Sequence, residues 1–369
     1  MSRMLWQKPQ KSSGRALGFR PPRLVLDPDL EWVLKRAFGP PTWAPTRPVS
    51  GQNLVNVALR LDVASRIAAQ HSRELIEREM GPVPGHRLRE QYVGTVARGA
   101  LLDHALNQLV DRARASEIPC ILLKYAALSR MGVLRVGARV ASDIDVLVPH
   151  ARARELQRIL QENGYRESSL PESNHQLPAL LDPNGVLIEL HLHVPLVTLP
   201  QTRAFARADD LLEAGLTTPS GNALLPDPAI VAAHAIAHGL MQHARAPHMY
   251  SPLKAFADLA DLESKRPGLL EQTGAYLATT FTATDLSSVR TLARALARGD
   301  LDTAMKGEAG ILLRHALASQ LDRRYAIWLR LGSLARPRTR PARRGPTELI
   351  MALRAAWGWA RSWSPTHRP

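Results

Sequence analysis

Two aspartates stand two residues apart in residues 139–148, RVASDIDVLV. The apolar residues after Asp145 predict a β-strand, and the two-residue repeat of a strand places Asp143 and Asp145 on one face. Two neighbouring carboxylates repel each other, so a cation between them would stabilise the pair. Oxygen ligands of this kind suit Mg²⁺ that also carries phosphate groups. The alternative is an edge strand with two surface acids, but the apolar run favours a central strand.

A third carboxylate lies on a second predicted strand, residues 186–194. Polar and apolar residues alternate strictly there, so Glu189, His191 and His193 share one face and the apolar residues take the other. Carboxylates on two neighbouring strands can hold two metal ions for in-line phosphoryl or nucleotidyl transfer. The histidines could ligate Zn²⁺ or Mn²⁺, but we prefer His191 as a contact to a metal ligand or to substrate. A turn signal at residues 182–185 predicts antiparallel pairing with a preceding short strand.

The chain resembles the uncharacterised nucleotidyltransferase family of the polymerase-β-like superfamily, over roughly residues 55–265. The family usually has a glycine directly after its lysine, which would let backbone approach a phosphate closely; this chain has Tyr125 instead. The matching pieces are residues 122–128 (LLKYAAL), residues 139–148, Gly164-Tyr165, His175, residues 188–191 (IELH), and a later helix with His234, His238 and Asp258.

This resemblance implies a metal-dependent enzyme that uses a nucleoside triphosphate, with ATP as the expected nucleotide and Mg²⁺ or Mn²⁺ as the metal. Asp143, Asp145 and Glu189 would be its catalytic residues and metal ligands. Lys124 lies at the end of a predicted strand and would contact the triphosphate as a point charge. An ordinary surface lysine is the alternative for this position.

The remaining candidate residues have weaker signals. Arg139 would share the face of the two aspartates on a continuous strand, where it could bridge to a carboxylate or clamp a phosphate. The resemblance assigns His175, His191, His234, His238 and Asp258 to the nucleotide or acceptor cleft. A loop histidine such as His175 is, taken alone, more often a surface residue. Buried hydrogen-bonded pairs with a structural role are the alternative for His234, His238 and Asp258.

The elements that would position these residues divide the chain into five segments. Residues 1–50 predict a mobile, basic, Pro-rich arm with a short helical piece near 30–38. Apolar stripes over 53–80 and 88–115, separated by a break at 81–85, predict an N-terminal helical layer over 51–116. Residues 117–200 would form the catalytic core, with a first strand at 117–124 and a helix that ends at Gly164. Residues 201–335 would form a C-terminal helical domain, followed by an Arg-rich linker and amphipathic helix over 336–369.

The expected fold class is therefore α+β: a polymerase-β-like core with a small mixed sheet, embedded in a largely helical protein. The formal net charge of +15 belongs mainly to the two ends, because residues 1–50 carry +6 and residues 336–369 carry +7. RNA could bind through these Arg-rich ends, whereas the nearly neutral middle argues against a nucleic-acid-binding core.

Composition also indicates the compartment. The single cysteine, Cys120, cannot form an internal disulfide, which fits a reduced, cytoplasmic protein. No run of 18 apolar residues predicts a transmembrane segment, and the N-terminus lacks the apolar core of a signal peptide.

The predicted reaction is transfer of a nucleoside monophosphate to an acceptor hydroxyl with release of pyrophosphate. A small alcohol, a peptide, a protein side chain and an RNA end are all candidate acceptors, and the oligomeric state stays open. The alternative is a nucleotide-sensing or nucleic-acid-binding protein that has lost catalysis, with Tyr125 as the mark of that loss.

Overall fold

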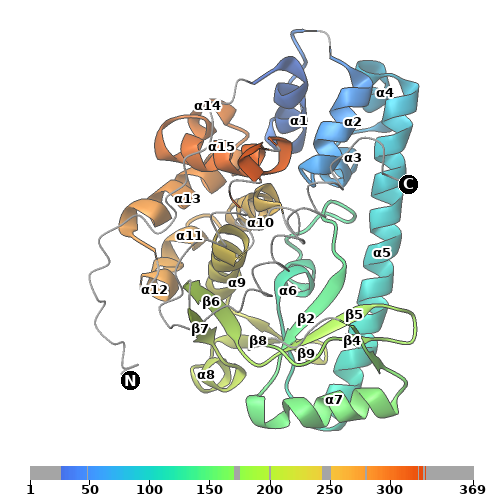
Figure 1. Cartoon of the computed structure of the whole chain (residues 1–369), viewed down its shortest axis with the longest axis vertical. Helices are drawn as coiled ribbons and strands as arrows, with labels where there is room; N and C mark the ends of the chain where they lie inside the picture. Colours follow the sequence, from blue (N-terminus) through green and yellow to red (C-terminus); the bar gives the residue numbers. More distant parts are fainter. Residues whose placement is uncertain are drawn as a thin grey trace, which may run out of the picture.

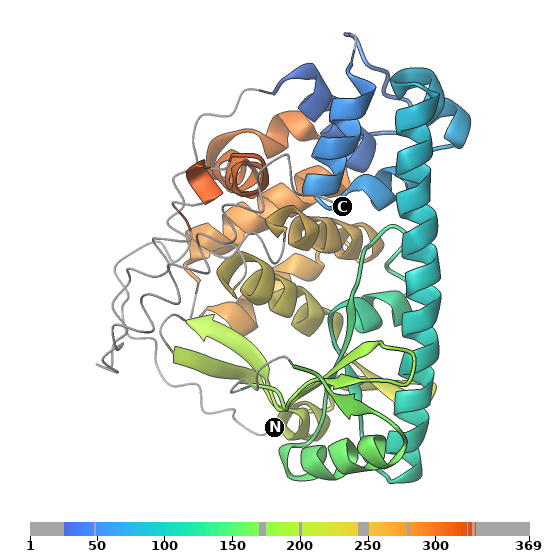
Figure 2. The ribbon, with the colours of Figure 1, turned by 45° about the vertical axis from the view of Figure 1, so that its right-hand side comes forward.

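The computed structural model describes residues 26–47, 49–169, 175–198, 201–242, 251–278, 281–322, 324–326 and 329. A β-sheet occupies one end of this part of the chain, and helices from both halves of the sequence pack at the other end (Figure 1). The long helix α5 (Pro82–Ala115) runs beside both (Figure 2). The predicted α+β fold, with a small mixed sheet embedded in helices, is therefore confirmed.

Four helices precede α5, and the stripe predicted over 53–80 is divided among three of them. Residues 1–25 lie outside the described residues. The short helix predicted near residues 30–38 is confirmed as the first helix, but its assignment to a mobile arm is wrong. Its side chains Trp32, Val33 and Leu34 are fully buried, and the burial of that much apolar surface holds the helix against the body. The four helices are α1 (Pro28–Phe38), α2 (Gly51–Arg60), α3 (Ala64–Gln70) and α4 (Arg73–Met80).

The chain breaks between α4 and α5 at a single residue rather than over 81–85. Gly81 takes φ +89°, a value that favours glycine, and Pro82 is the first residue of α5. Proline suits this first position because the missing N–H would have no partner inside the helix there.

Seven strands form the main sheet, in the order β3-β4-β5-β2-β1-β9-β8. The central strands β2 and β5 pair in parallel, and β4 pairs antiparallel with β5 as the turn signal predicted. The strands are β1 (Ile121–Leu122), β2 (Asp143–Leu147), β3 (Arg166–Glu167), β4 (Leu180–Leu181), β5 (Leu187–His191), β8 (Thr217–Ser220) and β9 (Ala223–Pro226).

The prediction that the chain is helical after Pro195 is wrong for the next thirty residues or so. Strands β6 (Val194–Thr198) and β7 (Gln201–Ala206) form a separate two-stranded sheet. After helix α8 (Ala208–Glu213), the hairpin β8–β9 returns to the main sheet, where β9 pairs in parallel with β1. Segments on both sides of residue 200 therefore build one sheet.

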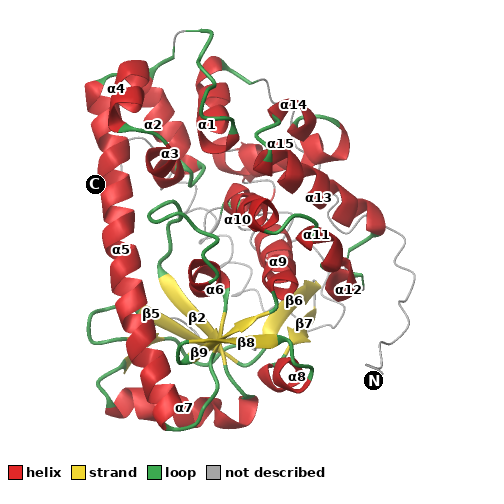
Figure 3. Cartoon of the chain, turned by 180° about the vertical axis from the view of Figure 1, so that it is seen from behind, coloured by secondary structure: helices red, strands yellow, loops and turns green. Residues whose placement is uncertain are grey.

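The helices α6, α9 and α10 lie between the sheet and the outer helices (Figure 3). A single cluster of buried apolar residues extends from Leu30 in α1 to Leu317 in α15, so the helical layers and the sheet share one core. No helix in the described ranges combines the length and apolar character needed to cross a bilayer. The remaining helices are α6 (Lys124–Arg130), the 3₁₀ turn η1 (His150–Arg152), α7 (Ala153–Glu162), α9 (Pro228–Ile236), the π-helical η2 (Ala237–Gln242), α10 (Pro252–Lys265), α11 (Leu269–Gln272), α12 (Gly274–Leu277), α13 (Ala283–Ala297), α14 (Leu301–Ala304) and α15 (Gly307–Leu321).

Candidate active site

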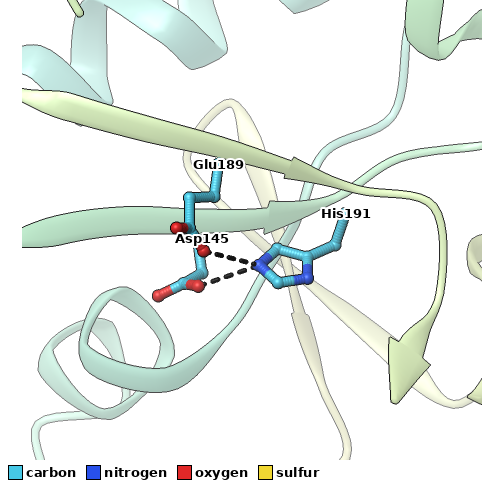
Figure 4. A group of neighbouring side chains, drawn as sticks. All are labelled: Asp145, Glu189 and His191. Atoms are coloured by element: carbon cyan, nitrogen blue, oxygen red, sulfur yellow. Dashed lines mark hydrogen bonds and ion pairs between the residues drawn. The ribbon is translucent and has the colours of Figure 1, made fainter. Parts of the chain in front are cut away.

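The parallel pairing of β2 and β5 brings two of the three predicted carboxylates together. Asp145 stands directly opposite Glu189 in the register, and His191 lies two residues further along β5 on the same face (Figure 4). The alternating apolar residues of both strands, such as Ile144 and Ile188, face the core on the other side. The strict alternation in the sequence thus positions acids on one side of the sheet and core on the other.

Asp145 is the most connected residue of the site. Its Oδ1 lies 2.6 Å from Lys124 Nζ and 2.8 Å from His191 Nε2, and its side chain is only 2% exposed. Burial alone would raise the pKa of this carboxyl, but the Lys124 charge and the hydrogen bond from His191 outweigh burial and hold the pKa well below its usual range. Asp145 is therefore ionised.

His191 lies between the two carboxylates. Its Nε2 is 2.8 Å from Asp145 and 3.4 Å from Glu189 Oε2. Burial lowers the pKa of this imidazole, yet the hydrogen bonds that its ring donates to the two carboxylates raise the pKa above its ordinary value. Its Nδ1 is buried and has no hydrogen-bond partner among the described residues.

Lys124 is the first residue of α6, directly after the short strand β1. The strand predicted over 117–124 is shorter, because β1 covers only Ile121–Leu122. Lys124 takes φ +43°, an uncommon backbone conformation for a residue with a side chain. Burial would lower its pKa, but Asp145, Asp143 and Glu189 raise it, so the ammonium stays charged inside the carboxylate cluster.

Asp143 opens β2, two residues before Asp145, and is partly buried. Its pKa is raised, first by burial and then by the charge of Asp145; Lys124 and Lys254 act in the opposite direction. Asp143 is thus a carboxylate held in an unfavourable environment. Such groups collect at functional sites.

The donor set fits a divalent cation. One ligand atom each from Asp145, Glu189 and His191 lies within 4.8 Å of the other two. Asp143 was predicted as a metal ligand, but it is a neighbour of this group rather than a member of it. Three carboxylates face two cationic groups, Lys124 and His191, so negative charge is in excess. Carboxylates favour Mg²⁺ or Mn²⁺, and a nitrogen ligand is more typical of Mn²⁺ or Zn²⁺.

Arg139 does not lie on β2, contrary to the shared strand face that was predicted. The strand begins at Asp143, and Arg139 instead reaches α10, where its Nε donates to both carboxylate oxygens of Asp258 at 2.8 and 3.0 Å. This is the bridge to a carboxylate that the sequence left open, but the partner lies on a distant helix. Both side chains are nearly buried.

The residues expected on later helices converge on the lysine. A small cavity of about 20 Å³, room for one water, is lined by Lys124 together with Arg139, His234, His238 and Asp258. The structure therefore brings together five of the predicted site residues that lie far apart in the sequence. This cavity alone is too small for a nucleotide.

His234 is buried, and its Nε2 has no hydrogen-bond partner among the described residues. Burial, followed by the charge of Lys124, lowers the pKa of His234 well below its usual value. The ring is therefore neutral and presents either a lone pair or an N–H toward the site. The ring of His238 lies edge-on to it at 5.4 Å between centroids.

His175 joins the site beside His191. Its ring centroid lies 5.5 Å from that of His191 and 6.3 Å from that of His193. Burial, with the charges of His191 and Lys124, lowers the pKa of His175 to about 4, so this ring is neutral as well. The isolated bridge between Gln176 and His191 holds its loop against β5.

One charged residue near the site was missed in the sequence. Lys254, in the first turn of α10, acts electrostatically on Asp143 and on the Arg139–Asp258 pair. The only signal was its position four residues before Asp258, which places the two side chains on one helix face. That spacing is common on ordinary helices.

Acidic residues on two paired strands, with a lysine at the start of the adjoining helix, are an arrangement suited to phosphoryl and nucleotidyl transfer. The chain belongs to a family described as uncharacterised nucleotidyltransferase, whose model matches residues 48–296. The resemblance in the sequence is thereby confirmed, and the protein is a nucleotidyltransferase. No curated protein and no solved structure shows a significant match.

Proposed function

We propose that this protein transfers a nucleoside monophosphate from a nucleoside triphosphate, with ATP as the expected donor, to an acceptor hydroxyl. The acceptor oxygen forms a bond to the α-phosphorus, the bond from that phosphorus to the bridging oxygen of the β-phosphate breaks, and pyrophosphate leaves. The observation that carries this proposal is the register of Asp145 opposite Glu189, with Lys124 bonded to the same cluster.

The side chains have separate tasks in this proposal. Asp145 and Glu189 would hold a divalent cation, with Asp143 beside them and His191 orienting Asp145. Mg²⁺ or Mn²⁺, when bound, supplies neutralisation of phosphate charge and activates a hydroxyl. Lys124 binds a phosphate oxygen, for which it exchanges its contact with Asp145.

The remaining groups act on the acceptor and around the nucleotide. Glu189 is the more accessible carboxylate of the facing pair, with a side chain 13% exposed against 2% for Asp145, so it accepts the proton of the acceptor hydroxyl. His234, neutral and buried beside Lys124, offers a hydrogen bond to the nucleotide.

The test separates metal binding from turnover. Glu189→Gln should bind Mn²⁺ at least about tenfold more weakly in equilibrium titrations. Glu167→Gln serves as the matched control, since Glu167 is an exposed acid on strand β3 of the same sheet. Purified protein with Mg²⁺, each α-labelled nucleoside triphosphate and cell extract should move label to an acceptor, and Asp143→Ala should not. Equal Mn²⁺ affinity in the wild type, Glu189→Gln and Glu167→Gln would contradict the proposed metal site.

A second candidate is a nucleotide-binding protein without turnover. It is favoured by one observation: Lys124 and His191 both contact Asp145, so internal cations already neutralise the central carboxylate. Nucleotide binding without pyrophosphate release, with any of the four nucleotides and with Mg²⁺ or Mn²⁺, would support this candidate over the enzyme.

A further inference from the structure

A groove along α5 is not used by any of the roles above. Its volume is about 470 Å³, which is within the range of about 300–1,000 Å³ that small-molecule sites occupy. The side chains of α5 that line it include Arg87, Gln91 and Arg98, and the wall is completed by Leu59 of α2 and by the segment 140–141. Spacings of four and eleven residues from Arg87 place the three α5 side chains on one face of the helix.

The groove lies directly beside the start of the catalytic strand. Ala141 lines the groove and precedes Asp143 by two residues, so their Cα atoms are at most about 7 Å apart. Two hydrogen bonds connect the groove with this carboxylate: Arg98 donates to the carbonyl oxygen of Ser142 at 2.6 Å, and the Ser142 hydroxyl donates to Asp143 Oδ1 at 3.3 Å. Ser142 is exposed and Asp143 is only partly buried, so this end of β2 is accessible from outside.

No described residue lines both the groove and the small cavity around Lys124. The segment that leads into β2 lies between them, because Arg139 lines the cavity whereas Val140 and Ala141 line the groove. In nucleotidyl transfer the attacking oxygen and the leaving oxygen lie roughly in line, on opposite sides of the phosphorus that is transferred. In the proposed reaction Lys124 binds the phosphates from the cavity side, so the acceptor approaches from the groove side.

The lining favours a small anionic acceptor. Arg87 and Arg98 contribute two positive charges, and Glu90, which lies 3.3 Å from His86, contributes one negative charge. The guanidinium of Arg98 is partly buried and is oriented by its hydrogen bond to the Ser142 carbonyl. Arginine binds carboxylate and phosphate oxygens through paired N–H groups. The apolar side chains of the wall contributed by α2 and by the segment 140–141 can cover carbon atoms of the ligand.

We infer that this groove is the acceptor site, and that it takes a small compound with a hydroxyl group and an anionic group, either a carboxylate or a phosphate. Arg98 and Arg87 bind the anionic group, and the hydroxyl group is directed past Ser142 toward the carboxylates of β2 and β5. The hydroxyl oxygen forms its bond to the α-phosphorus, pyrophosphate leaves, and the hydroxyl proton goes to Glu189. The inference rests on the proposed function and names the substrate class that the proposed function leaves open.

The experiment blocks the groove with Gly94→Phe. A Cβ added at Gly94 has no heavy atom of another element within 4 Å, so a larger side chain at this position extends into the groove without displacing the core. Val93→Phe is the matched control, because Val93 is the exposed neighbour of Gly94 on α5 and does not line the groove. Arg98→Met removes an anion-binding charge, and its control is Arg89→Met, at an exposed arginine of the same helix outside the groove.

Equilibrium binding of glycerol 3-phosphate, glycerate and glycerol is measured on the full-length protein with Mg²⁺ and a non-hydrolysable ATP analogue present. At least one of the two anions should bind to the wild type, the tighter one identifies the anionic group, and glycerol should not bind measurably. Arg98→Met should weaken anion binding by about 10- to 100-fold, the usual effect of losing one charged hydrogen bond, and Gly94→Phe should abolish it. Binding of the ATP analogue should change less than twofold, and both controls should behave as the wild type does.

The outcomes are distinguishable. If the wild type binds no ATP analogue or transfers no label from α-labelled ATP in cell extract, the proposed function fails and this inference fails with it. If the wild type binds the analogue but neither anion, or if Gly94→Phe binds the anions as the wild type does, the inference alone is overturned. Should Gly94→Phe not fold, Arg98→Met makes the same comparison.

Two further results would assign the groove differently. Loss of analogue binding in Gly94→Phe would place the nucleotide in the groove and overturn the inference. A bound anion should either receive label from α-labelled ATP or inhibit the transfer of label to the acceptor in the extract. An anion that does neither, or label that passes only to an RNA or a protein of the extract, would show that the groove is not the site of a small anionic acceptor.

Discussion

The two aspartates of β2 should have opposite effects on stability although both are needed for activity. Asp143 has a raised pKa because of burial and the charge of Asp145, so its ionised form is less favourable in the folded protein than in the unfolded chain. Asp145 has a lowered pKa because Lys124 and His191 outweigh its burial. At pH 7 the charge of Asp143 therefore subtracts from stability, and the charge of Asp145 adds to it.

The magnitudes follow from the contacts. Asp145→Asn keeps the shape but leaves Lys124 and His191 without the charge that compensates them, 2.6 and 2.8 Å away in a buried place. Removing one partner of a buried ion pair costs about 3–5 kcal/mol. Asp143→Asn removes a repulsive charge and should raise the free energy of unfolding by about 0.5–2 kcal/mol, the usual range for a single stabilising substitution.

Urea unfolding followed by circular dichroism at pH 7, without metal, measures both changes. Pyrophosphate release measured on the same preparations should be lost in both variants. Glu167→Gln, at an exposed acid on strand β3 of the same sheet, is the control for a general effect of neutralising a carboxylate in this sheet. If Asp143→Asn and Asp145→Asn shift the free energy of unfolding in the same direction, the electrostatic account of the site is wrong.

Two further predictions concern stability. The pKa of His191 is raised, because its hydrogen bonds to Asp145 and Glu189 exceed the effect of burial. The protonated ring therefore stabilises the fold. This stabilisation is complete below the pKa of about 6.5 in the unfolded chain and is lost as the pH rises through the pKa in the folded protein. Urea unfolding of the metal-free protein from pH 6 to 9 should show this fall, and His191→Gln should flatten it. Arg139→Met should lower the free energy of unfolding by about 3–5 kcal/mol, because it leaves Asp258 buried and unpaired. If Arg139→Met lowers the free energy of unfolding by less than about 1 kcal/mol, the Arg139–Asp258 pair does not stabilise the fold as predicted.

Local patterns predicted the strands of the site and the antiparallel pairing of β4 with β5, but not the register between β2 and β5. Strict alternation is enough to place Glu189 and His191 on one face of β5. The register that puts Glu189 opposite Asp145 depends on pairing between strands some forty residues apart, which no local pattern encodes. The prediction that Arg139 shares a strand face with the two aspartates was wrong for the same reason. Its side chain is directed by the ion pair with Asp258, which lies 119 residues away in the sequence.

The hairpin β8–β9 was missed because its sequence argues locally against a strand. Pro219 lies within β8, and a proline in a stretch of sequence argues against predicting that stretch as a strand. The structure explains why it is tolerated: β8 is the last strand of the sheet, so its outer edge needs no backbone donor. Only the tertiary position, which the sequence does not reveal, makes the proline acceptable.

Tyr125 replaces the glycine that the family usually has, yet the backbone at position 125 does not take a conformation that requires glycine. The positive φ belongs to Lys124, one residue earlier, and Tyr125 is an ordinary helical residue of α6. Its ring lies 5.9 Å from the guanidinium of Arg139, and its hydroxyl would lie 3.0 Å from a Cβ added at Gly99 of α5. The side chain thus extends toward α5 and Arg139, while Lys124 reaches Asp145. Strained backbone held at a functional residue is typical of a working site, so Tyr125 is weaker support for lost catalysis than its sequence position indicated.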